Sequence, residues 1–108
     1  MAMVKDTTLG RPEAAEAAEL FKVLGDCTRV MVLQTLIQAE ELCVGDLAEA
    51  VDMSPSSVSH HLRVLRQAHL VRFRRAGREV LYAPDDQHVE HLLSICVEHM
   101  RHRGEEHA

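Results

Sequence analysis

One stretch, residues 54–83, constrains the fold of this 108-residue chain more than any other. It begins with Ser54-Pro55, which is typical of a helix start because serine caps a first turn and proline fits the first helical position. The apolar residues that follow recur at helical spacing and predict a helix to about Ala68. From Leu70 to Ala83 the apolar period changes to two around Gly77, so a β-hairpin is expected directly after the helix.

Further helices are predicted on both sides of this stretch, from apolar residues at helical spacing. They are expected at residues 13–24, 28–39, 44–51 and about 86–103. The sequence therefore predicts a mainly α fold with one β-hairpin, a winged helix-turn-helix that dimerises through its terminal helices. The expected divisions are a flexible arm at 1–12, the domain at 13–103 and a tail at 104–108.

The charge is distributed unevenly, and this distribution says more than the net charge of −5. Residues 53–78 contain no Asp or Glu but hold six of the twelve Lys and Arg, whereas residues 1–52 hold ten acidic and four basic residues. A basic segment that coincides with the predicted helix and hairpin indicates a surface for a polyanion. Double-stranded DNA is the expected partner, because few aromatic residues are present to stack on single strands.

The helix after Ser54 is expected to enter the major groove with its polar face. Short hydroxyls, histidine and arginine share that face, and such side chains can donate to phosphates and reach base edges. The arginines of the hairpin are expected on the DNA backbone or in the minor groove. The predicted DNA-binding residues are Ser54, Ser56, Ser57, Ser59, His60, Arg63, Arg74, Arg75 and Arg78.

The composition indicates in which cellular compartment the chain is expected. The chain has no apolar run near the roughly 18 residues that span a membrane, and its first residues lack a hydrophobic signal core. The three cysteines, Cys27, Cys43 and Cys96, are too few for a disulfide framework and fit a reducing compartment. We therefore expect a cytoplasmic protein with no membrane partner.

The last predicted helix carries four of the eight histidines in one sector of its surface: His88, His91, His99 and His102. His99 and His102 are three residues apart and can reach one metal ion. Asp86 and His88 form a second pair at the helix start. Imidazole and carboxylate donors suit zinc and its neighbours.

A single helix cannot close both pairs on one ion. His88 and His99 are eleven residues apart, about 16 Å along a helix axis, whereas zinc ligands lie about 2 Å from the metal. Two antiparallel copies can do so, because the start of one helix then faces the end of the other. The spacing predicts two equivalent intersubunit sites, each with Asp86 and His88 from one chain and His99 and His102 from the other. His91 is a substitute or additional ligand.

The apolar side of the same helix supports a dimer. It forms one stripe of Val89, Leu92, Leu93, Cys96 and Met100. A terminal helix with such a stripe needs a partner, and in so small a domain we expect that partner to be the symmetry mate.

Together these residues resemble the ArsR/SmtB family of winged-helix metal-sensing repressors over roughly residues 14–103. The resemblance rests on FKVLGDCTRVMVLQTL, ELCVGDLAEAV, SPSSVSHHLRVLRQAHLVRFRRAGREVLYA and DDQHVEHLLSICVEHMRH, of which the third is the most specific. The fourth matches the D-x-H and H-x-x-H pattern of the zinc-sensing subgroup. Another metal site of the family uses C-x-C in the third helix. Here Cys43 is followed by Gly45 at the second position, so that site is predicted to be absent.

The resemblance implies a homodimer that binds an operator inverted repeat without metal and releases it when metal binds. Zn(II) is the expected metal, with Co(II) as an alternative, since three His and one Asp fit a tetrahedral ion. Ni(II), which usually takes more ligands, is a further alternative. The resemblance also implies that His99 reaches the loop after the recognition helix, near His69, and so links metal binding to DNA binding.

Two other functions fit the same scaffold. A thiol-based redox or persulfide sensor would use two of the three cysteines and release DNA in response to oxidant. A DNA-binding regulator that ignores metal is the second alternative. An enzyme is not expected, because four protein ligands leave no open coordination position and no acid–base pair accompanies the site.

Overall fold

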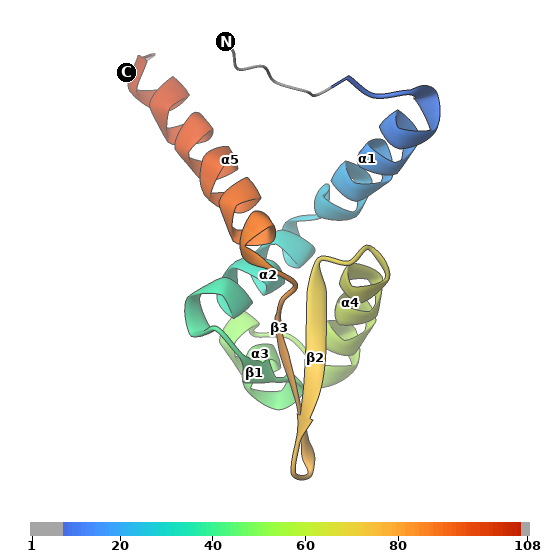
Figure 1. Ribbon diagram of the computed structural model, residues 1–108. Coiled ribbons are helices and arrows are strands. Elements are labelled where there is room, and N and C mark those ends of the chain that lie inside the picture. The colour runs from blue at the N-terminus through green and yellow to red at the C-terminus, as the bar shows by residue number, and fades with distance from the viewer. Residues whose placement is uncertain (1–7, 107–108) are drawn as a thin grey trace.

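Three helices and a small sheet enclose one core, and two further helices project from it (Figure 1). The structure is a computed structural model that describes residues 8–106. Its elements are α1 (Arg11–Leu24), α2 (Cys27–Ala39), β1 (Leu42–Cys43), α3 (Val44–Val51), α4 (Pro55–Gln67), β2 (Val71–Ala76), β3 (Glu79–Pro84) and α5 (Gln87–Glu106). Helices α1 and α5 diverge at one end of the molecule, and the β2–β3 hairpin extends at the other. The predicted winged helix-turn-helix is confirmed.

Two helix starts are fixed by side-chain caps that the sequence pattern indicates. The Ser54 hydroxyl accepts a hydrogen bond from the Ser57 N–H at 3.1 Å, so α4 begins where Ser54-Pro55 predicts. Asp26 caps α2 in the same way, with its Oδ1 accepting from the Arg29 N–H at 3.1 Å. Each cap satisfies a backbone donor that has no partner inside its helix.

The core lies between α2, α3, α4 and the base of the hairpin. Its most deeply buried side chains are Val32, Leu33, Leu36, Leu47, Val58, Leu62, Leu65 and Val71. Between α3 and α4 the chain turns sharply at Asp52, which adopts a left-handed conformation with φ of 57°. The helix-turn-helix is thereby held by apolar contacts on the inner face of α4, and the outer face is left to solvent.

The sheet has three antiparallel strands in the order β1-β3-β2. Phe73 pairs with Tyr82 and Arg74 with Leu81, and Gly77 takes a φ of 66° in the turn between β2 and β3. The pattern predicted only a hairpin, because β1 is a two-residue strand too short to show a period. Its Leu42 and Cys43 pair with Tyr82 and Leu81 of β3.

Several sequence expectations about boundaries and burial are corrected. Helix α1 begins at Arg11, within the expected arm, and α5 continues to Glu106, within the expected tail. The remainder of the expected arm before residue 8, and residues 107–108 of the tail, lie outside the described residues. Phe73 has the same place in the alternation of β2 as the buried Val71, yet it is 39% exposed because β2 runs beyond the core at that point. In the part of the chain that the structure describes, no helix combines the length and apolar character needed to cross a membrane.

Candidate functional site

The outer face of α4 carries most of the residues predicted to contact DNA. Ser56, Ser59, His60 and Arg63 are all exposed there. Two other predicted contacts have structural partners as well: the exposed Ser54 hydroxyl caps the helix, and the half-buried Ser57 supplies the capped N–H. The sequence assigned all six residues to one role, whereas the structure gives Ser54 and Ser57 a part in starting the helix.

The predicted arginines of the hairpin divide between the two faces of the sheet. Successive residues of a strand point to opposite sides, so Arg74 and Arg75 diverge. Arg74 bonds to Glu41 with two hydrogen bonds, from Nε to Oε2 at 2.6 Å and from Nη2 to Oε1 at 2.9 Å. This contact lowers the pKa of Glu41 and raises the pKa of Arg74. Arg75 and Arg78 are exposed near the tip.

A contact between α4 and the wing was not predicted from the sequence. The Arg66 guanidinium lies over the Phe73 ring, 4.3 Å from its centroid, and the Phe73 and Tyr82 rings are 5.8 Å apart. A cation over an aromatic face is attracted by the ring quadrupole, so this stack ties the end of α4 to β2. Arg66 was visible in the sequence only as one of six basic residues, and its partner becomes apparent only once the hairpin folds back.

The predicted metal ligands at the start of α5 lie together. Asp86 directly precedes the helix, and its Oδ1 accepts hydrogen bonds from the N–H groups of His88, at 2.9 Å, and Val89, at 3.3 Å. Its other oxygen, Oδ2, is 3.3 Å from His88 Nδ1. The side-chain contact with His88 is the main reason why the pKa of Asp86 is lowered. Asp86 therefore lies just before the first turn of α5, where its carboxylate shares one side with the imidazole two residues later.

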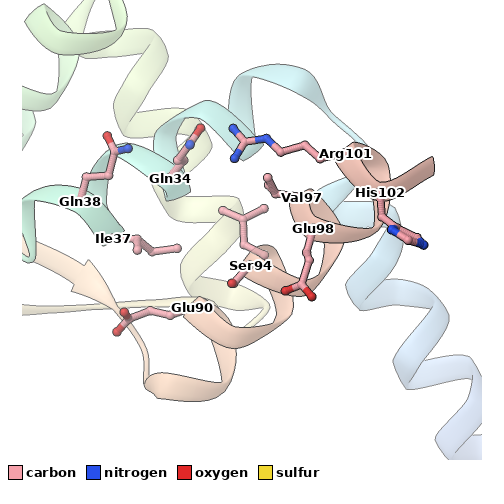
Figure 2. Close-up of a pocket in the computed structure, with 10 residues that line it drawn as sticks. Gln34, Ile37, Gln38, Glu90, Ser94, Val97, Glu98, Arg101 and His102 are labelled. Carbon is pink, nitrogen blue, oxygen red and sulfur yellow. The ribbon is translucent and has the colours of Figure 1, made fainter. Parts of the chain in front are cut away.

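The remaining predicted ligands lie further along α5. His99 is exposed on the helix, and His102 lines a groove of about 660 Å³ between α2 and α5 (Figure 2). The groove is lined from α2 by Gln34, Ile37 and Gln38 and from α5 mainly by Glu90, Ser94, Glu98 and Arg101. Asp86, His88 and His91 border an adjoining hollow nearer the helix start. Among the described residues of one chain, no three His, Cys, Asp or Glu side chains come together as a metal-binding group.

His69, the predicted allosteric link, follows α4 in a left-handed conformation with φ of 60°. Its N–H donates to the Arg66 carbonyl at 3.0 Å, which closes the end of the helix. Within the described part of a single chain, the hydrogen bonds include none between His69 and His99. Cys27 and Cys96 are exposed, and Cys43 is half-buried at the junction of β1 and α3.

These features define a class of protein. Helices α3 and α4 form a helix-turn-helix, the β2–β3 hairpin forms its wing, and basic side chains line the outer surface of both. The chain is similar to a homodimeric winged helix-turn-helix DNA-binding domain from Mycobacterium bovis, solved in solution, with a TM-score of 0.80 and 27% identity over 100% of this chain and 96% of that one. The class is that of winged helix-turn-helix DNA-binding proteins.

Two relatives identify the family. A transcriptional repressor SmtB homolog from Synechocystis is 40% identical over 91% of this chain and 74% of that protein. A cadmium resistance transcriptional regulatory protein, a CadC homolog from Staphylococcus aureus, is 37% identical over 86% of this chain and 77% of that protein. The profile of the bacterial regulatory protein arsR family matches residues 26–72. The chain belongs to this arsR family, which consists of transcription regulators and not of enzymes.

Proposed function

We propose that the chain is a zinc-responsive transcriptional repressor that binds operator DNA as a homodimer without metal and releases it when metal binds. The observation that carries this proposal is the arrangement of α5, which presents Asp86 and His88 at one end and His99 and His102 towards the other. Membership of a family of transcription regulators supports the regulatory role. A relative named for cadmium resistance supports a response to metal. Such a repressor acts on DNA in the cytoplasm.

The proposed DNA surface combines α4 and the wing. Ser56, Ser59, His60 and Arg63 would face the major groove, because the buried side of α4 leaves them outward. Arg75 and Arg78 would meet the DNA backbone or the minor groove from the wing. Ser54, Ser57 and Arg74 are included in the surface, although each also has a partner within the chain.

The proposed dimer uses the two projecting helices. Helix α1 has no buried residue in the single chain, and its Phe21 is 61% exposed. On α5, Val89 reaches the core, but Ile95 and Met100 further along are 53% and 57% exposed. Apolar side chains exposed on both projecting helices support an isologous interface in which α1 and α5 meet their symmetry mates.

The donor set fits zinc or a similar ion. Asp86 and His88 already share one side of the helix start, with their side chains 3.3 Å apart. Three imidazoles and one carboxylate are ligands that zinc accepts, and bound zinc supplies a fixed tetrahedral geometry without redox chemistry. His91 borders the same hollow as Asp86 and His88, which supports it as a substitute or additional ligand for an ion such as Ni(II).

The proposed response depends on how the chain's own residues constrain the helices. If each site takes Asp86 and His88 from one subunit and His99 and His102 from the other, the two α5 helices are held in one relative geometry. That geometry sets the spacing of the two α4 helices, which must match successive major grooves. A hydrogen bond from the second ring nitrogen of His99 to the turn at His69 is the proposed link to α4.

One experiment tests the function. The purified dimer is used to select a binding site from random double-stranded DNA, and affinity for that site is then measured with Zn(II), Co(II), Ni(II), a chelator or a mild oxidant. We expect tight binding with chelator and weakened binding with zinc. Release by oxidant alone, with no effect of any metal, would instead establish a thiol sensor. Binding that responds to neither would establish a metal-independent regulator.

A further inference from the structure

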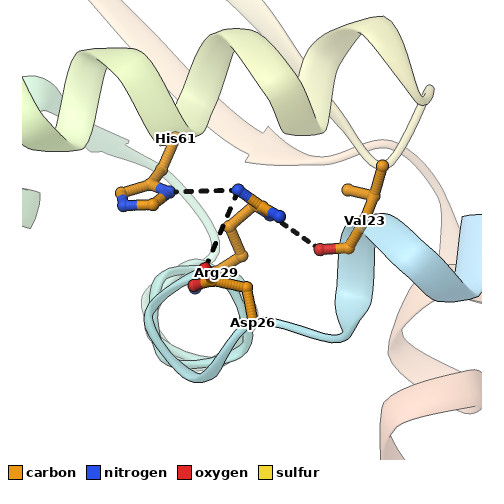
Figure 3. A network of polar contacts seen from close by, with 4 residues as sticks. All are labelled: Val23, Asp26, Arg29 and His61. Atoms are coloured by element: carbon orange, nitrogen blue, oxygen red, sulfur yellow. Dashed lines mark hydrogen bonds and ion pairs between the residues drawn. The ribbon is translucent and has the colours of Figure 1, made fainter.

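One arginine side chain of α2 contacts both α1 and α4, at the junction between the projecting helix α1 and the helix-turn-helix (Figure 3). Arg29 belongs to the first turn of α2, and its Nε donates to the Val23 carbonyl at 2.7 Å. Its Nη1 lies 3.5 Å from His61 Nδ1 on α4 and 4.0 Å from Asp26 Oδ2 at the start of α2. None of these contacts involves the face of α4 proposed to bind DNA or the ligands proposed on α5.

The contact with Val23 matters because α1 is weakly anchored. Val23 lies in the last turn of α1, where carbonyl groups have no partner within the helix. Helix α1 has no buried residue, and only Leu20, Val23 and Leu24 pack partly against the core. A charged donor 2.7 Å from a terminal carbonyl is therefore a large part of what fixes the direction of α1.

The contact with His61 connects the same side chain to the recognition helix. Arginine has donors only, so His61 Nδ1 acts as the acceptor and its ring proton resides on Nε2. His61 is half-buried and directly follows His60, whose ring lies 5.6 Å away on the outer face of α4. The planar guanidinium thus spans the space between the end of α1 and the middle of α4.

We propose that Arg29 is a positioning residue that fixes the orientation of α1 relative to α4, and thereby the spacing of the two α4 helices in the dimer. This inference rests on the proposed function, because the spacing matters only in a dimer that binds two half-sites. It assigns Arg29 no contact with DNA or metal. Its effect is confined to how well the two halves of the dimer fit one operator together.

The test compares a full operator with a half-site. The wild-type chain first selects an operator from random double-stranded DNA. Affinities are then measured for that operator, for a version with one half-site replaced by unrelated sequence, and for versions with one base pair added or removed between the half-sites. The variants are Arg29→Lys, which keeps the charge but loses the planar guanidinium, and His61→Ala, which removes the contact of Arg29 with α4 and leaves its contact with Val23. Arg11→Lys, at an exposed position at the start of α1, is the matched control.

We expect Arg29→Lys to weaken binding to the full operator about tenfold while changing half-site binding less than about twofold. The preference for the natural spacing should broaden, because α1 no longer fixes one orientation. His61→Ala should show a smaller effect of the same kind. The double variant should lose no more than Arg29→Lys alone, since Arg29→Lys already breaks the contact with His61.

Other outcomes overturn the inference. Equal losses on the full operator and the half-site would mean that Arg29 supports only the local fold of α4. Unchanged binding to the full operator, with unchanged spacing preference, would mean that packing alone orients α1. If Arg29→Lys fails to fold, His61→Ala decides by the same comparison. If the wild-type chain selects no site, both the proposed function and this inference are wrong. If the wild type selects a site and the variants bind it as the wild type does, only this inference is wrong.

Discussion

Arg74 on β2 and Glu41 before β1 form a two-pronged ion pair, with N–O distances of 2.6 and 2.9 Å. The pair crosses the sheet on the face that carries Leu81, and the side chains are 54% and 33% exposed. Because Glu41 neutralises Arg74, the two neighbouring arginines of the wing do not offer DNA the same charge. The full charge of Arg75 is available to a phosphate. Arg74 would have to bind the phosphate while still paired with Glu41, or break that ion pair.

We therefore predict unequal effects on DNA binding. Arg75→Ala should reduce the slope of log affinity against log salt by about 0.9, the value for one phosphate contact on B-DNA. Arg74→Ala should reduce it by less, and Glu41→Gln should strengthen binding at low salt because it removes a negative charge beside the wing. Titration of the selected operator at several salt concentrations measures all three. Equal reductions for Arg74→Ala and Arg75→Ala would show that the ion pair opens on DNA.

Ser54 and Ser56 differ in role although they are two residues apart. Ser54 caps α4 by accepting the Ser57 N–H, whereas Ser56 is exposed on the first turn. We predict that Ser54→Ala lowers the free energy of unfolding by about 1 kcal/mol, and that Ser56→Ala leaves it within about 0.5 kcal/mol. Urea denaturation at one fixed protein concentration measures both, since the stability of a dimer depends on concentration. A similar loss for both variants would contradict a capping role confined to Ser54.

Local patterns predicted the elements that form the DNA-binding part of the fold. The start of α4 and the hairpin after it follow from Ser54-Pro55 and from the change of period at Leu70. Strand β1 could not be predicted, because two residues have no period and the strand exists only through its pairing with β3. The exposure of Phe73 likewise depends on where the core ends, which no local pattern records.

In the candidate site, too, some contacts could be expected from the sequence and others could not. The sequence paired Asp86 with His88 as neighbours at the expected helix start, and the structure places their side chains 3.3 Å apart because Asp86 lies just before the first turn of α5. Their role as metal ligands stays a prediction. The contacts of Arg29 with His61 and of Arg74 with Glu41 join residues 32 and 33 positions apart. Such pairs arise from tertiary packing, and a single sequence gives no signal for them.

Asp26 leads to a prediction about pH. The hydrogen bond from the Arg29 N–H, followed by the positive charge of the Arg29 side chain, lowers the pKa of Asp26. Because the pKa is lower in the folded chain, ionised Asp26 stabilises the fold above the unfolded pKa of about 4, and this stabilisation is lost as the pH falls through the folded pKa. Asp26→Asn keeps an acceptor for the cap but does not titrate. The stability difference between wild type and this variant should therefore be greatest near neutral pH and shrink below about pH 4.

Urea denaturation at pH values from 7 to 3 measures that difference, in about one-unit steps through the range where Asp26 titrates. Glu16→Gln is a suitable control, because Glu16 is exposed on α1. The control should show little change with pH relative to wild type. A stability difference for Asp26→Asn that is constant across the range would show that the charge of Asp26 contributes nothing beyond the cap.

A substitution of Cys43 tests whether the family's other metal site, the C-x-C site of the third helix, has a role in this chain. Its position at the start of α3 resembles that of a ligand in the family's C-x-C pattern, but the second position is Gly45. A lone half-buried thiol offers one ligand, which is too few to hold zinc. We predict that Cys43→Ser leaves zinc affinity and zinc-dependent release of DNA unchanged. Loss of release with retained folding would show that the third helix takes part in metal sensing.

The crossed metal site can be tested with a mixed dimer. One chain carries His88→Ala and the other His99→Ala, and two different affinity tags allow the heterodimer to be purified. If each site takes Asp86 and His88 from one chain and His99 and His102 from the other, one site of the heterodimer lacks two ligands and the other is intact. Each mutant homodimer instead has two sites that lack one ligand each. Zinc titration should recover about one tight site per heterodimer, where neither homodimer binds tightly.

A second mixture is the matched control for the first. Pairing His88→Ala with Asp86→Asn places both changes in the same half of the site, so each site of that heterodimer lacks one ligand and no tight binding should return. The expectation rests on the rise of a helix, since the eleven residues between His88 and His99 extend about 16 Å, too far to close on one ion. A site built within one chain would give no recovery in either mixture. Recovery in the first mixture alone is the result that only a crossed intersubunit site produces.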